Sequence, residues 1–410
     1  MSWLKTLFPR EGRASDDEGD KHFWLAMREN YGYWLTIGCL NPKGPRWSKL
    51  LLLATLICWL ILVATSYHVL YTDPGLVCES VHFIIFVVVN FNFWISFFIQ
   101  SETIIDIYRQ MGAGFYDYGE LLDPETRGKV DRLIAQTKGR KKMLMKGFSL
   151  MAFLTYFSMN IARPLLKILN DDVTAVGQPG MFPLLPVTFW LPVQVTTLSY
   201  TLMFALVEVA SFNFTGVVVG HIFFFLATCE EVSLECRVVA LTLGSAKRIS
   251  LASSVPLSVC LSHSIRHHQV IIRTVDKVER IVYYPAMFYI VCSGVLLCIS
   301  GFLFLTDKID LIAKMSFACF LISEMLGALV YCYYGEKVKT MSSEIYNELY
   351  FGDWIEDMVE VKNYNLIVQA RSFDGLTISA GGFLQLNLET YTNVLSSAFS
   401  YFNILNAIST

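Results

Sequence analysis

Uncharged polar residues recur at helical spacing along the final segment of the chain, TYTNVLSSAFSYFNILNAIST. In a helix, residues separated by three or four positions lie on one face. One such face carries Asn393, Ser397, Ser400, Ile404, Ala407 and Ile408. Contact between lipid and hydroxyl or amide groups costs free energy, so this face is expected to meet protein or water.

Two arrangements would satisfy this polar face. The first is hydrogen bonding to a neighbouring helix, which small polar residues often provide in membranes. The second is a water-filled pore, and the change from Ser400 to Ile404 favours it because a hydrophobic ring can gate a pore by dewetting. One helix cannot enclose a pore, so several copies around an axis are required. Uncharged hydroxyls would select weakly, so we expect monovalent cations and some Ca²⁺ to pass.

Ionisable residues inside apolar segments form the next group of candidates. Glu208 and Glu324 fall in two such segments, where a carboxylate is costly unless it has a partner or a function. Structural pairing with Arg163, Lys167 or Lys314 is the favoured interpretation, and a functional role is the alternative.

Three histidines, His263, His267 and His268, have the spacing of a helical metal site. They lie in a polar segment, and packing is the preferred interpretation, so we expect no metal ligand here. The sequence shows no Ser/His/Asp group and no phosphate-binding loop. We therefore expect no catalytic residue, no cofactor and no enzymatic activity.

The composition indicates what kind of scaffold positions these residues. Of the 410 residues, 54% are hydrophobic and only 16% are charged, which is typical of an all-α membrane protein with several spans. A helix needs roughly 20 apolar residues to cross a bilayer. On that rule, seven spans are predicted near residues 50–70, 76–99, 143–169, 196–226, 281–305, 309–334 and 376–408.

The distribution of Lys and Arg predicts the orientation of the spans. The segments 1–49, 100–142, 227–280 and 335–375 together hold 27 of the 32 basic residues. The opposite connections hold only Lys308. Basic residues favour the cytoplasmic side, so the N-terminus is predicted to be cytoplasmic and the C-terminus extracellular. The net charge of −3 gives no reason to expect a nucleic-acid partner.

These spans divide the chain into four predicted parts. Residues 1–49 form a cytoplasmic N-terminal segment, and residues 50–334 form six transmembrane helices. Apolar residues at three- and four-residue spacing predict cytoplasmic helices with one buried face in 335–375. This segment is either an anchor for assembly or an ordinary helical segment with a solvated face. Residues 376–410 form the last membrane helix, which carries the polar face.

The connection at 170–195 has an unusual composition. Four prolines prevent a regular helix, yet Phe182, Phe189 and Trp190 are too apolar for a solvated loop. We expect this loop to fold down as a lid on the helix bundle. An ordinary aromatic anchor at the membrane interface is the alternative.

The C-terminal part of the chain is similar to a known family. The segments CYYGEKVKTMSSEIYNELYFGDW and IVQARSFDGLTISAGGFLQLNLETYTNVLSSAFSYFNILN resemble the C-terminal signature of insect odorant receptors. The close match covers about 75 residues from Cys332. Upstream, PVTFWLPVQVTTLSYTLMF and NYGYWLTIGCLNP are looser matches in the expected places.

The resemblance implies a heteromeric ligand-gated cation channel in the plasma membrane of olfactory sensory neurons. In this family an odorant-tuned subunit assembles with a shared co-receptor as a tetramer. The last helices line the pore and cytoplasmic helices form a central anchor, which would correspond to residues 337–370. SYFNIL aligns with the gate segment and places the gate at Ile404. The connection 227–280 has 54 residues, shorter than that of the co-receptor, which implies a tuning subunit.

Two related classes of receptor provide the alternatives. A seven-helix receptor coupled to G proteins would place its N-terminus outside, against the charge distribution. Gustatory receptors resemble this chain at Thr390 and Tyr391, but the Gln-Phe pair of their last helix is missing here.

The family's ligand pocket lies in the outer half of the bundle, between the second, third, fourth and sixth spans. Aromatic residues and few polar groups occupy the corresponding turns. The candidate ligand contacts are His82, Phe83, Phe86, Tyr156, Met159, Tyr200, Phe204, Phe317 and Phe320. Such walls would suit a small volatile aromatic or heterocyclic odorant, with one hydrogen bond from His82 or Tyr156.

Overall fold

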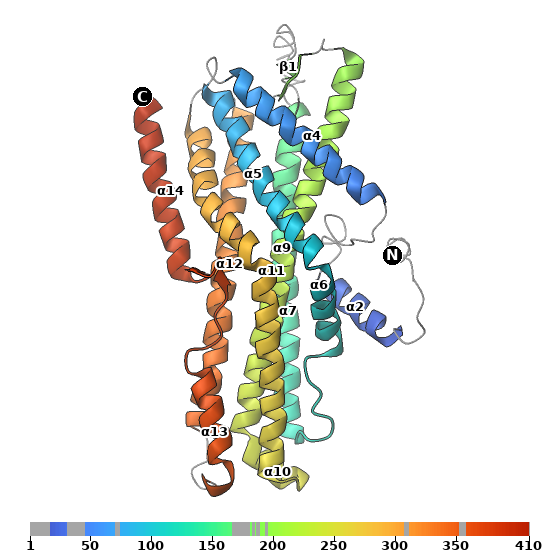
Figure 1. The fold of residues 1–410 in the computed structure, drawn as a ribbon, viewed down its shortest axis with the longest axis vertical. Helices are drawn as coiled ribbons and strands as arrows, with labels where there is room; N and C mark the ends of the chain where they lie inside the picture. Colours follow the sequence, from blue (N-terminus) through green and yellow to red (C-terminus); the bar gives the residue numbers. More distant parts are fainter. Residues whose placement is uncertain are drawn as a thin grey trace.

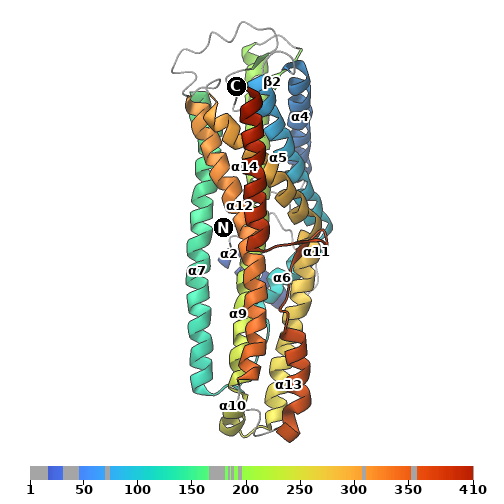
Figure 2. The ribbon, with the colours of Figure 1, turned by 90° about the vertical axis from the view of Figure 1, so that its left-hand side faces the viewer.

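The computed structural model describes most of the chain. It covers residues 17–30, 46–69, 74–165, 181–182, 185, 189–192, 196–306, 311–351 and 358–409. The fold is all-α, as predicted, and the long helices run along the length of an elongated bundle (Figure 1). The C-terminus lies at the upper end of this bundle (Figures 1 and 2).

Each of the seven predicted spans contains a helix. They are α4 (Arg46–Val69), α5 (Pro74–Ile99), α7 (Pro124–Phe157), α9 (Thr197–Gly244), α11 (Leu257–Leu305), α12 (Leu311–Tyr350) and α14 (Leu388–Ser409). Among the described residues, four helical segments have the length and apolar content of a membrane span, Val77–Ile99, Thr197–Gly244, Leu257–Leu305 and Leu311–Tyr350. A shorter apolar helix covers Leu53–His68. Basic residues in α7 and hydroxyls and amides in α14 reduce the apolar content of these two helices.

Three helices are much longer than a bilayer requires. α9, α11 and α12 have 48, 49 and 40 residues, so at about 1.5 Å per residue each extends well beyond the hydrocarbon core. The connection at 227–280 is therefore mostly helix. It comprises the end of α9, the short helix α10 (Ala246–Ser253), a turn and the beginning of α11. Residues 227–243 contain no Gly or Pro, and buried Val232 and Val239 hold this extension in the core.

The lower half of the molecule consists of the extended ends of the long helices and one added helix. α13 (Met358–Ser372) packs against the lower parts of α11 and α12 (Figure 1). α12 continues without a break across the boundary predicted between residues 334 and 335, because Tyr334 and Val338 on either side are buried in one core. The division into a membrane bundle and a cytoplasmic anchor remains a prediction.

Two shorter helices pack together at the side of the bundle. α2 (Asp17–Glu29) packs on α6 (Ser101–Ala113), and the His22 ring nitrogen Nδ1 lies 3.1 Å from the carbonyl oxygen of Gly112. A Cβ atom at Gly112 would collide with the backbone of His22, so glycine is required for this contact. Residues 31–45, which belong to the predicted N-terminal segment, lie outside the described residues.

The predicted last span began too early. Its first residues form a hairpin of β3 (Ser379–Ala380) and β4 (Leu384–Gln385), and α14 begins only at Leu388. Gly381 and Gly382 adopt positive φ angles of 64° and 77°, which favour a turn over a helix. The Glu279 carboxylate on α11 fixes the hairpin by accepting hydrogen bonds from the backbone N–H and hydroxyl of Ser379.

Candidate functional site

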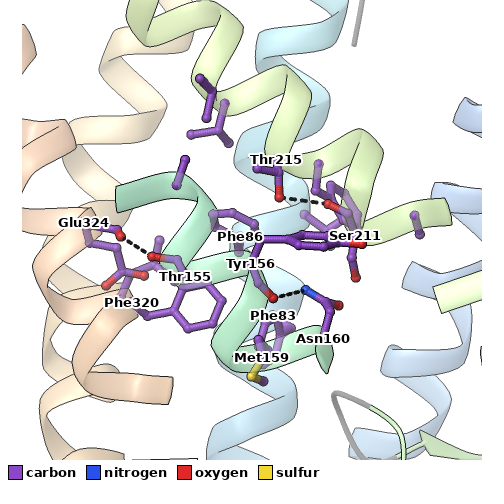
Figure 3. A pocket seen from close by; sticks show the side chains of 18 of the residues that line it. Phe83, Phe86, Thr155, Tyr156, Met159, Asn160, Ser211, Thr215, Phe320 and Glu324 are labelled. Carbon is purple, nitrogen blue, oxygen red and sulfur yellow. Dashed lines mark hydrogen bonds between the residues drawn. The ribbon is translucent and has the colours of Figure 1, made fainter. Parts of the chain in front are cut away.

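A cavity of about 160 Å³ lies between the upper parts of α4, α5, α7, α9, α11 and α12. Five of the nine predicted ligand contacts line it, namely Phe83, Phe86, Tyr156, Met159 and Phe320. These side chains come from α5, α7, the turn after α7 and α12, and Figure 3 shows them close together around the cavity. The rings of Phe83 and Phe320 meet edge to face, with centroids 5.6 Å apart. The wall on this side is therefore largely aromatic.

The other four candidates do not line the cavity. His82 and Phe317 are fully buried behind the aromatic wall, and the His82 ring packs edge to face on Phe317 and Phe320. Neighbouring residues on a helix point about 100° apart, so Phe83 reaches the cavity whereas His82 faces a neighbouring helix. Tyr200 is half-buried against an apolar cluster that includes Leu185 and Met203, and the Phe204 side chain is exposed.

A polar cluster lies directly behind the aromatic wall. His82 Nε2 lies 2.8 Å from Glu324 Oε1, and the Ser300 hydroxyl donates to Glu324 Oε2 at 3.1 Å. All three side chains are buried, and Glu324 also lines the cavity. The partners of Glu324 are therefore His82 on α5 and Ser300 on α11.

Two further charged groups in the upper half have partners of their own. The Tyr156 hydroxyl donates a hydrogen bond of 2.7 Å to Glu208, and Arg163 contacts the buried carboxylate of Glu79 at 2.5 Å. These charged groups have structural partners, but not the predicted ones, because Glu208 bonds to Tyr156 and Arg163 bonds to Glu79. Lys167 lies outside the described residues.

Helix α4 and the connection at 170–195 also contribute to the wall. The sequence did not predict the contribution of α4. Cys58 and Leu62 come from α4, and Phe189 comes from β2 (Phe189–Trp190), which pairs with β1 (Met181–Phe182). The Trp190 ring stacks on His68 with centroids 4.0 Å apart. The described part of the loop thus folds onto the bundle, as expected of a lid.

Polar atoms in the cavity wall mostly bond to each other or to the backbone. The hydroxyls of Thr155 and Ser323 lie 2.7 Å apart, and the Thr215 hydroxyl donates to the Ser211 carbonyl at 3.0 Å. Asn160 lies on η1 (Ser158–Ala162), a π-helical turn that continues α7. Its amide nitrogen donates to the carbonyl oxygen of Tyr156 at 3.0 Å (Figure 3).

The polar face predicted on the last helix is exposed in the single chain. Asn393, Ser397, Ser400, Ile404 and Ala407 all lie on the outer surface of α14, and 58% of Ile404 is exposed. The Ser397 hydroxyl donates to the backbone carbonyl of Asn393. The side chain of Ile408 lies outside the described residues.

The opposite face of α14 packs on α11. The Val394 side chain faces Gly294 of α11, and the Phe402 side chain faces Gly301 of the same helix. Ala398 between them is buried. This apolar face attaches the helix to its own chain and leaves the polar face exposed.

A second polar network joins α7, α9 and α12 below the predicted spans. The buried Glu230 carboxylate accepts hydrogen bonds from Arg140 at 2.8 Å, Lys337 at 2.7 Å and Tyr334 at 2.9 Å. Burial raises the pKa of Glu230, but hydrogen bonds from Arg140 and Lys337 outweigh burial and leave this pKa below its ordinary value. The Glu230 carboxylate is therefore ionised and lies between the cationic side chains of Arg140 and Lys337.

The three histidines do not form a metal site in the described part of the chain. The His263 ring lies 2.9 Å from the Tyr116 hydroxyl, and the His267 ring lies 3.0 Å from the Tyr118 hydroxyl. No cluster of three or more His, Cys, Asp or Glu residues able to hold a metal occurs among the described residues.

Comparison with known proteins identifies the family. The family model described as 7tm odorant receptor matches residues 73–399. The chain belongs to this family. Odorant receptor 2a of Drosophila melanogaster is 29% identical over 148 residues, which cover 36% of each chain. Odorant receptor 23a of the same insect is 23% identical over 145 residues, or 35% of this chain and 38% of that one. The chain thus matches little more than a third of the length of these receptors.

A solved odorant receptor has the same fold. The olfactory receptor OR5 from Machilis hrabei, in complex with eugenol, superimposes with a TM-score of 0.76. The match covers 96% of this chain and 100% of that one at 13% identity. OR5 without eugenol gives a TM-score of 0.75. The structural similarity shows that the two chains share a fold. Membership of the odorant receptor family places this chain in a family of multi-pass membrane receptors.

Proposed function

We propose that this chain is the odorant-binding subunit of a heteromeric ligand-gated non-selective cation channel. It would act in the plasma membrane of olfactory sensory neurons. A small volatile molecule binds in the cavity of the upper bundle and opens a pore lined by α14. The observation that carries this proposal is a largely apolar cavity, walled by six helices, in a member of the odorant receptor family.

The size and walls of the cavity support a small ring-containing ligand. Engineered apolar cavities of about 150 Å³ take up benzene, so about 160 Å³ suits a molecule with one ring. Phe83, Phe86 and Phe320 present aromatic faces and edges for stacking. Phe189 from the lid covers a further part of the cavity wall.

The exposed polar face of α14 supports a pore formed with other subunits. A single chain leaves Asn393, Ser397 and Ser400 on its surface, where contact with lipid would be unfavourable. Clustering of four such helices around an axis would place these groups against water and passing monovalent cations or Ca²⁺. A shared co-receptor would supply the other subunits of the tetramer, and the cytoplasmic helices would form its anchor within the lipid-embedded assembly.

Helix α11 offers a physical connection between ligand and pore. Tyr289 and Leu296 line the cavity, while Gly294 and Gly301 on the same helix contact α14. A ligand that binds better to one arrangement of α11 shifts the population towards the α14 position that accompanies it. A few kcal/mol of differential affinity is sufficient to change gating strongly.

Expression with a co-receptor and recording of membrane current tests the proposal. Ile404→Ala should raise the basal current, because a smaller side chain removes the dry constriction. Phe399→Ala is the matched control, since Phe399 is exposed on the same helix but lies to the side of the polar face. Equal basal and evoked currents for Ile404→Ala and wild type, or strict selectivity for K⁺ or Cl⁻, would contradict the pore assignment.

A further inference from the structure

One polar atom at the cavity stands out because it has no partner. Asn160 is only 6% exposed and lines the cavity, and its side-chain oxygen Oδ1 makes no hydrogen bond within the described structure. An unpaired buried amide oxygen costs free energy comparable to a lost hydrogen bond. A donor that enters the cavity would remove this cost.

The local backbone explains the position of this oxygen. Asn160 lies in the middle of the π-helical turn Ser158–Ala162, and such turns occur often at functional sites. Its Nδ2 donates to the Tyr156 carbonyl, which fixes the orientation of the amide, because the reversed amide would bring two oxygen acceptors together. Figure 3 shows the nitrogen facing Tyr156 and the oxygen on the opposite side of the amide.

Several other polar groups of the cavity wall are already engaged. Thr155 and Ser323 bond to each other, and the Tyr156 hydroxyl donates to Glu208. The Glu324 carboxylate contacts His82 and Ser300 on its two oxygens. Among the described residues lining the cavity, Asn160 is the one whose buried side chain retains an unpartnered polar atom.

We propose that Asn160 determines ligand specificity by accepting a hydrogen bond from the odorant. The preferred ligands are then small aromatic molecules that carry one hydroxyl group, such as phenols and benzylic alcohols. This inference rests on the proposed function, because it concerns the ligand of the same cavity. One buried hydrogen bond contributes on the order of 1.4 kcal/mol, so the hydroxyl should improve the half-maximal concentration about tenfold.

Matched pairs of ligands test this proposal on the channel expressed with a co-receptor. Phenol and anisole have the same ring, as do benzyl alcohol and benzyl methyl ether, but the methyl ethers have no donor. In wild type, each hydroxyl compound should act at about one tenth of the concentration of its ether. In Asn160→Leu, which removes the acceptor at similar side-chain volume, this ratio should approach one while the ethers remain effective.

Asn90 provides a closely matched control. It is buried on α5, its Nδ2 donates to the Phe86 carbonyl at 2.9 Å and its Oδ1 is also unpaired, but it does not line the cavity. Asn90→Leu should therefore keep the tenfold ratio. A general loss of stability would lower the current for both ligands of a pair and leave their ratio unchanged.

The outcomes separate this inference from the proposed function. Equal potency of alcohol and ether in wild type, or an unchanged ratio in Asn160→Leu, would overturn the role of Asn160 and leave the channel intact. Absence of any evoked current across a broad panel of ring compounds would overturn the proposed function, and the role of Asn160 with it.

Discussion

The Glu230 network makes the sharpest prediction about stability. Glu230→Gln preserves the shape of the side chain and removes its charge. The side chain of Glu230 is 1% exposed, and that of its partner Lys337 is only 11% exposed, so the variant leaves an ammonium group buried without a counter-charge. Arg140 is 45% exposed and can turn towards water. The main cost therefore arises from Lys337.

The size of the effect follows from this burial. Removing one partner of a buried ion pair costs about 3–5 kcal/mol. An unfolding entropy of about 2.1 cal/mol/K per residue gives roughly 0.9 kcal/mol/K for the 410 residues of the chain. Glu230→Gln should therefore lower the melting temperature by about 3–6 °C.

Thermal unfolding of the purified receptor in detergent, followed by tryptophan fluorescence, measures this change. The double variant Glu230→Gln with Lys337→Met removes both charges and should recover most of the lost melting temperature. The reasoning is wrong if Glu230→Gln melts within about 1 °C of wild type, or if the double variant is no more stable than the single one.

The same network predicts how stability depends on pH. The pKa of Glu230 is lower in the folded chain than its ordinary value of about 4.3. A carboxylate with a lowered folded pKa stabilises the fold above the unfolded pKa, and this contribution is lost as the pH falls through the folded pKa. Between about pH 5 and pH 3 the melting temperature should fall more for wild type than for Glu230→Gln.

Two further variants probe the parts that surround the cavity and the pore. Gly335→Ala should lower the evoked current and the melting temperature, because its Cβ would collide with the Leu386 carbonyl just before α14. Gly147→Ala on α7 is the control. Its Cβ has open space, so this variant should be neutral or slightly stabilising. A normal current and melting temperature for Gly335→Ala would show that the hairpin adapts. Trp190→Ala removes the stacking on His68 that attaches the lid, so the half-maximal odorant concentration should rise by about three- to tenfold while the basal current stays constant. An unchanged dose–response curve would separate the lid from ligand binding.

Periodic patterns in the sequence predicted the features that depend on one helix alone. The interval of three and four residues from Asn393 to Ile404 defined the polar face of α14, and the structure exposes that face. Runs of apolar residues predicted seven spans, and each of these contains a helix in the structure. The C-terminal segment from Cys332 carried the resemblance to the odorant receptors.

The tertiary structure alone decided which side chains meet. The sequence did not distinguish Phe83 from His82 as a cavity residue, because the rotation of α5 depends on how it packs against α12 and α11. The same packing selected His82 as the partner of Glu324 and placed Asn160 at the cavity wall. Sequence intervals fix the relative directions of side chains within a helix, whereas contacts between distant segments fix which direction faces the cavity.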